Sequence, residues 1–213
     1  MTVLEAISAM SEVPISTQVL LPLLNKYKRP YDKIDQLVQD GWLTQIKRGL
    51  YTAGAKIKSD HPDSFLIANH LYGPSYISAS SALSFWGLIP EKVMLVQSTA
   101  TRTTKSFNTK LGTFEYIHCK PQAFRIGLNQ VRISASQTII IATAEKALCD
   151  LIIQTPGINL RSNKQTLQFL EEDQRMNMDA IFKMQQSIIA DCIKYCPKPQ
   201  SLQVLLKTIQ TNA

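Results

Sequence analysis

Residues 30–51 constrain the fold of this chain more than any other segment, because they predict a helix followed at once by a hairpin. Pro30 suits the first helical turn, where its missing N–H has no intrahelical partner, and aliphatic residues then repeat at helical spacing. That repeat consists of Ile34, Leu37 and Val38. After Gly41 the side chains alternate as in a strand, and a Lys-Arg-Gly turn at 47–49 leads into a returning strand. The segment therefore predicts a helix beside a hairpin with two cations at its tip.

Two further helices are predicted upstream, over residues 1–11 and 17–25, and Ser16 is a suitable N-cap for the second of them. Pro22 lies inside that second helix and should kink or shorten it. Three helices and a hairpin in this order are typical of a winged helix-turn-helix domain, which we expect over residues 1–56. Domains of this order dock on DNA, although some bind only protein.

Positive charge is concentrated in two regions of the sequence. The 213 residues carry a formal net charge of +7, which favours a polyanionic partner. Residues 26–58 hold eight Lys or Arg against three acids, and residues 92–135 hold seven against one. Residues 136–213 are nearly balanced, with eight against seven. Each basic region is either a nucleic-acid contact or an ordinary solvated surface.

Eight residues of the first region are predicted to contact double-stranded DNA. Those on the exposed face of the predicted helix would face the major groove, and cations on both sides of it would hold phosphates. The predicted groove residues are Tyr31, Lys33 and Gln36. The predicted phosphate contacts are Lys26, Lys28, Arg29, Lys47 and Arg48.

Residues 60–213 are expected to form a second, α+β domain after a polar linker near residues 53–60. Two helices come first, and a mostly antiparallel sheet of four short strands follows. The predicted strands are residues 93–96, 112–118, 130–133 and 138–141. Helices are predicted from about residue 143 to 155 and over 163–172, 177–194 and 201–211. The whole chain is thus expected to be α+β, with helices at its C-terminus.

The second basic region offers a possible further surface. Its cations are Arg102, Lys105, Lys110, Lys120 and Arg125. Arg102 and Lys105 stand among several Ser and Thr residues in the segment 97–106. Hydroxyls together with cations make good phosphate ligands. Phe107, Tyr116 and Phe124 are interleaved with these cations and would either stack on unpaired bases or belong to the core. An RNA-binding or RNA-processing protein is therefore the alternative to a DNA-binding one.

The sequence contains none of the common nucleotide-binding or hydrolase motifs, so no enzyme activity and no cofactor are predicted. Glu145 and Asp150 point about 140° apart on one helix, so they do not form a carboxylate pair. Glu145 is instead expected to complement the helix dipole. His118 beside Cys119 is weak evidence for a nucleophile pair, because no orienting group is evident.

The four cysteines, Cys119, Cys149, Cys192 and Cys196, are too few and too irregular for a disulfide framework. We expect free thiols and no metal site, since no zinc-binding spacing occurs. No apolar run approaches the roughly 20 residues that span a bilayer, and the N-terminus does not read as a signal peptide. A cytoplasmic protein without a membrane partner is expected.

Four motifs, in this order, resemble those of AbiEi-type antitoxins, the repressors of type IV toxin–antitoxin systems that act in abortive infection against phage. In the predicted hairpin they are Gly41-Trp42-Leu43 and Arg48-Gly49-Leu50-Tyr51. In the second half they are Tyr76-Ile77-Ser78-Ala79-Ser80-Ser81-Ala82-Leu83 before Gly87-Leu88, then Thr101-Arg102, and finally Ala142-Thr143-Ala144-Glu145-Lys146-Ala147-Leu148-Cys149-Asp150. The family usually has proline where this chain has Ala144, which is a mild change at a helix start.

The resemblance implies a repressor that binds repeats upstream of its own operon. It also implies a C-terminal domain that counters a nucleotidyltransferase-like toxin without forming a stable complex with it. A stand-alone winged-helix transcription factor without a toxin is the other alternative, because no sequence pattern reveals a neighbouring gene.

Overall fold

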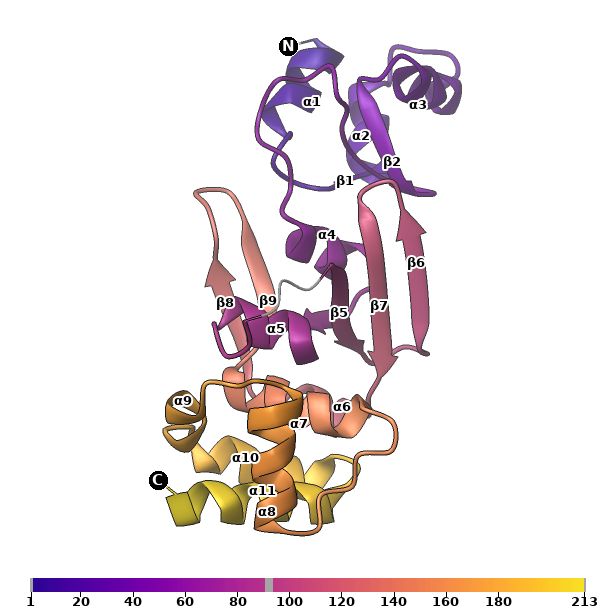
Figure 1. Ribbon diagram of the computed structural model, residues 1–213. Helices are drawn as coiled ribbons and strands as arrows, with labels where there is room; N and C mark the ends of the chain where they lie inside the picture. The colour runs from indigo at the N-terminus through magenta and orange to yellow at the C-terminus, as the bar shows by residue number, and fades with distance from the viewer. Residues whose placement is uncertain (1, 91–93, 213) are drawn as a thin grey trace.

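The computed structural model describes residues 2–90 and 94–212, which form an α+β protein (Figure 1). The N-terminal unit, residues 2–57, combines three helices with a small antiparallel sheet of strand order β1-β3-β2. Its helices are α1 (Val3–Ala9), α2 (Thr17–Leu23) and α3 (Pro30–Gln39). Its strands are β1 (Ile15–Ser16), β2 (Leu43–Lys47) and β3 (Leu50–Ala53). The helix and hairpin predicted over residues 30–51 are both present.

Local chemistry accounts for where these helices begin and end. The Thr2 hydroxyl accepts from the N–H of Glu5, and the Glu5 carboxylate accepts from the N–H of Thr2, which is a capping box for α1. Ser16 is the N-cap of α2, but its hydroxyl makes no capping hydrogen bond. Gly41 turns the chain after α3 with a φ of 77°, a conformation that glycine adopts without strain.

The second unit, residues 60–212, is built on a six-stranded mixed sheet of order β6-β7-β5-β4-β9-β8. Its strands are β4 (Ser75–Ile77), β5 (Leu95–Ala100), β6 (Lys105–Thr109), β7 (Gly112–His118), β8 (Leu128–Arg132) and β9 (Thr138–Ala142). The expectation of four strands was wrong, since β4 and β6 were missed. Three of the five neighbouring pairs of these strands are antiparallel, as expected of a mostly antiparallel sheet, whereas β5 with β7 and β4 with β9 are parallel. Val93, the first residue of one predicted strand, lies outside the described residues.

Helices pack against the sheet of the second unit, and the helices from residue 144 onward gather at the end of the molecule away from the N-terminal unit (Figure 1). Figure 1 shows the N-terminal unit at one end of the molecule, the sheet in the middle and the C-terminal helices at the other end. The first four helices are α4 (Ser64–Leu71), α5 (Ala79–Phe85), α6 (Pro121–Phe124) and α7 (Ala144–Gln154). The last four are α8 (Asn163–Leu167), α9 (Met178–Phe182), α10 (Gln186–Tyr195) and α11 (Pro199–Asn212). A π-helical segment, Gln168–Asp173, continues α8, and the helix predicted over 177–194 is broken between α9 and α10.

Two hydrophobic cores form, and the β2–β3 hairpin takes part in both. Leu43 and Tyr51 belong to the core of the N-terminal unit, whereas Ile46 and Leu50 belong to the large core of the second unit. Ile57, within the predicted linker, is buried in the N-terminal core. The hairpin therefore joins the two units by packing as well as by chain connection. Within the residues described, no helix is both long and apolar enough to cross a bilayer.

Candidate functional site

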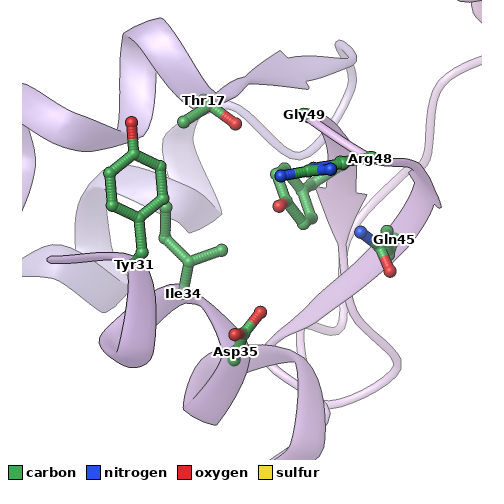
Figure 2. A pocket seen from close by; sticks show the side chains of 8 residues that line it. Thr17, Tyr31, Ile34, Asp35, Gln45, Arg48 and Gly49 are labelled. Carbon is green, nitrogen blue, oxygen red and sulfur yellow. The ribbon is translucent and has the colours of Figure 1, made fainter.

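A hollow of about 720 Å³ lies between α3 and the β2–β3 hairpin, and we call it the α3–hairpin cleft. Figure 2 shows the Tyr31 ring and the Arg48 guanidinium on opposite sides of this cleft, with the Asp35 carboxylate pointing in between them. The lining residues come from α2, α3, β2, β3 and the hairpin turn: Thr17, Tyr31, Ile34, Asp35, Gln45, Arg48, Gly49 and Tyr51. An open hollow of this kind suits an extended ligand that lies across the two elements.

The walls of the cleft are held by core packing and by one backbone contact. Ile34 is buried in the N-terminal core and anchors α3 from its inner face. The hairpin turns at Gly49, which has a φ of 83°, and the carbonyl of Gly49 accepts from the N–H of Thr17 at 3.0 Å. Because this bond fastens the hairpin tip to the start of α2, Arg48 is presented from a fixed backbone.

The predicted groove residues do not all share this cleft. Tyr31 lines it and is 63% exposed. Lys33 and Gln36 do not line it, and the Lys33 ammonium donates instead to the Gln36 amide oxygen at 2.9 Å. The same ammonium lies over the ring of Tyr27, 5.3 Å from its centroid. The structure thus brings Tyr31 together with Asp35 and Gln45, which the sequence reasoning missed.

The predicted phosphate contacts before α3 remain at the surface. Lys26 and Lys28 are exposed in the segment that leads into the helix. Arg29 is also exposed and pairs with the Asp32 carboxylate at 3.4 Å. An exposed pair of this kind is worth little and exchanges readily for another anion. These three cations flank α3 on its N-terminal side.

The two cations of the hairpin point to different places. Arg48 is exposed and faces the cleft. Lys47 is half-buried and donates to the backbone carbonyl of Leu71, at the end of α4. Burial lowers the pKa of Lys47, and the neighbouring charges of Arg102 and Lys105 lower it further. Lys47 therefore turns toward the second unit rather than into the cleft.

The predicted second basic surface is divided among separate places. Arg102 and Lys105 lie over the Tyr72 ring, 5.5 Å and 6.0 Å from its centroid, and together with Lys47 they form what we call the cation cluster. Lys110 follows the far end of β6, while Lys120 and Arg125 flank the short helix α6. Lys92, which adds to the basic excess of this region, lies outside the described residues.

The aromatic side chains of this region belong to the core. Tyr116 is fully buried, and its hydroxyl donates to the carbonyl of Ala68 at 2.7 Å. Phe107 and Phe124 pack against the large core. Of the two alternatives open from the sequence, core packing is the one observed, and a row of exposed stacking rings is not formed by these residues.

A buried polar network joins two of the three second-half motifs of the sequence, the first and the last. The Lys146 ammonium donates to the Asp150 carboxylate at 2.7 Å, and both side chains are almost fully buried. The hydroxyls of Tyr76 and Ser78 donate to the other oxygen of Asp150 at 2.9 Å and 2.6 Å. Ser78 is the N-cap of α5, yet its hydroxyl is used here and not for capping. The network thus fastens β4 and the start of α5 to α7.

Charge pairing decides the protonation of this network. Burial lowers the pKa of Lys146, but the Asp150 carboxylate together with the neighbouring Cys192 and Cys196 outweighs that effect, so the pKa is raised overall. Burial also raises the pKa of Tyr76 well above its usual value, and the negative charge of Asp150 adds to this. Lys146 is therefore held as a cation and Tyr76 as a neutral phenol. Lys146 and Asp150 form a buried structural ion pair, and the Tyr76 hydroxyl donates a hydrogen bond to it.

Of the weak candidates for catalysis, His118, Cys119 and Asp150 line one small cavity, whereas Glu145 lies elsewhere. The Nδ1 atom of His118 lies 3.1 Å from the carbonyl oxygen of Arg102, so that ring nitrogen is engaged by backbone and not by Cys119. Burial raises the pKa of Cys119 to about 12, which keeps its thiol protonated. Glu145 stands in the first turn of α7 and accepts from the N–H of Gln185 at 3.0 Å.

All four cysteines are free. Across residues 2–90 and 94–212, no three His, Cys, Asp or Glu side chains are placed to hold a metal ion. A comparison of the sequence with protein-family models gives no match, and neither does a comparison with curated proteins.

Proposed function

We propose that this chain is a DNA-binding repressor whose N-terminal unit is a winged helix-turn-helix. In this proposal α3 is the recognition helix and the β2–β3 hairpin is the wing. The order α1-β1-α2-α3-β2-β3, with its antiparallel β1-β3-β2 sheet, supports that assignment. The observation that carries it is the α3–hairpin cleft, which presents Arg48 and Tyr31 toward a shared open hollow.

One DNA strand would pass through the cleft. With α3 in the major groove, Arg48 would hold a phosphate from the wing side, and Lys26, Lys28 and Arg29 would hold phosphates at the entry to α3. Tyr31 would face the groove from within the cleft, whereas Lys33 and Gln36 would face it from another side of the helix. We do not include Lys47 among the phosphate contacts in the cleft, because its ammonium donates to the Leu71 carbonyl in the second unit.

The cation cluster would extend this surface along the molecule. Lys47, Arg102 and Lys105 gather their charges beside the hairpin, and phosphates are the ligands such a cluster attracts most strongly. A duplex that extends beyond the cleft would therefore contact the cation cluster as a second set of positive charges on the same protein.

The antitoxin role rests on the resemblance to AbiEi-type antitoxins. We propose that the second unit counters a nucleotidyltransferase-like toxin without a stable complex, that the protein is not an enzyme, and that it works in the cytoplasm. The buried network of Lys146, Asp150, Tyr76 and Ser78 gives two of the three family-like motifs of this unit a common structural task. The RNA-binding alternative is not favoured, since the aromatic residues it needs are in the core.

Binding of the full chain to duplex DNA tests the proposal. Fluorescence anisotropy would compare the DNA upstream of its own gene with a shuffled duplex of the same length and composition. We expect the upstream DNA to bind at least about a thousandfold more tightly at physiological salt, which is the lower end for specific binding. Equal affinity for the two duplexes would contradict a repressor. A nucleotidyltransferase-like reading frame beside the gene would separate an antitoxin from a stand-alone transcription factor.

A further inference from the structure

One acid stands among the side chains of the α3–hairpin cleft. Asp35 lies one helical turn after Tyr31, is exposed, and directs its carboxylate into the hollow that Arg48 faces from the hairpin (Figure 2). The neighbouring Asp32 is paired with Arg29, but no ion pair of Asp35 occurs in the described part of the chain. A carboxylate at this position repels phosphates, so a DNA-binding surface should lack it unless it recognises something else.

The chemistry of the major groove narrows what an ionised carboxylate can recognise. Such a group only accepts hydrogen bonds, and only the amino groups of cytosine and adenine donate in that groove. Adenine presents its N7 acceptor next to its amino group, which repels a carboxylate. Cytosine presents its N4 amino group without an adjacent acceptor of its own.

The two opposite charges across the cleft match the two parts of a DNA strand, its phosphates on one side and its base edges on the other. Arg48 offers a cation on the hairpin side, where the proposed path places a phosphate, and Asp35 offers an anion on the helix side, where it places base edges. We propose that Asp35 is a specificity residue that accepts a hydrogen bond from the N4 amino group of one operator cytosine. This inference rests on the proposed DNA-binding function and names the base that one of its residues selects.

Substitution of Asp35 by asparagine gives the sharpest test. The Asp35→Asn amide both donates and accepts, and asparagine pairs with the amino group and N7 of adenine. Full-length wild type and D35N would each select binding sites from a random duplex library. We expect wild type to prefer cytosine at one position by about tenfold and D35N to prefer adenine at that position. Asp40→Asn, a change at the exposed C-cap of α3 outside the cleft, should leave the preference unchanged.

A second variant separates recognition from simple repulsion. Asp35→Ala should lose the cytosine preference at that one position and keep the preferences at all others. If D35A binds every duplex more tightly by the same factor, with cytosine still preferred, Asp35 only repels the backbone and the inference is overturned. A wild-type chain that selects no sequence at all would overturn the proposed repressor function as well, which distinguishes the two failures.

Discussion

The Lys146–Asp150 pair shows how a motif can be visible in sequence while its task is not. Lys and Asp four residues apart share one helix face, which sequence spacing does predict. The two hydroxyls that complete the network come from Tyr76 and Ser78, more than seventy residues earlier, and no local pattern reveals such a contact. The signal present in the sequence was the recurrence of polar residues inside otherwise apolar motifs.

Removal of one partner from this pair should be far more costly than removal of both. In Asp150→Ala the buried Lys146 ammonium loses its counterion, and we expect a loss of about 3–5 kcal/mol in the free energy of unfolding. The double variant K146M/D150L replaces both charges by apolar groups and should lose less. Urea unfolding of both variants would measure this, and a double variant at least as unstable as D150A would contradict the account.

At the scale of elements, the helix and hairpin of residues 30–51 could be predicted because their amphipathic periods are strong and change abruptly at Gly41. β4 was missed because all three of its residues are buried, so it shows no alternation. β6 was missed because it is an edge strand with mostly polar side chains. The parallel pairs could not be predicted either, since register between distant strands leaves no local trace.

The candidate site could likewise be predicted only in part, because contacts between distant residues leave no local pattern in the sequence. The pattern of cations identified the hairpin tip and the approach to α3, but it placed Lys47 and Arg48 together. The structure separates them: the strand pairing shifts register between Gln45 and Lys47, the Lys47 ammonium donates to the Leu71 carbonyl in the second unit, and Arg48 lines the cleft. Asp35 was overlooked since an acid does not belong to a charge pattern chosen for phosphates.

The shared hairpin predicts that the two units unfold together. Each unit contains one tryptophan, Trp42 in the N-terminal unit and Trp86 in the second, and these are the two tryptophans of the chain. The variants W42F and W86F each leave one reporter. Their fluorescence transitions in urea, each read against circular dichroism of the same variant, should coincide. An early separate transition of Trp42 would show that the hairpin does not couple the units.

At the scale of the whole molecule, the proposed DNA-binding surface runs from the segment before α3, through the α3–hairpin cleft, to the cation cluster. Two units contribute to it, since the second basic region supplies Arg102 and Lys105 to the cation cluster. The C-terminal helices lie at the opposite end of the molecule from the N-terminal unit (Figure 1). In that part of the sequence, acids and cations nearly balance.

The salt dependence of DNA binding by the Arg48→Ala variant tests the central claim most directly. Each phosphate contact contributes about 0.9 to the slope of log K against log salt, so R48A should bind every duplex more weakly and with a slope smaller by about 0.9. Arg161→Ala, at an exposed position before α8, serves as the matched control and should leave the slope unchanged. A wild-type slope in R48A would contradict the placement of DNA in the cleft.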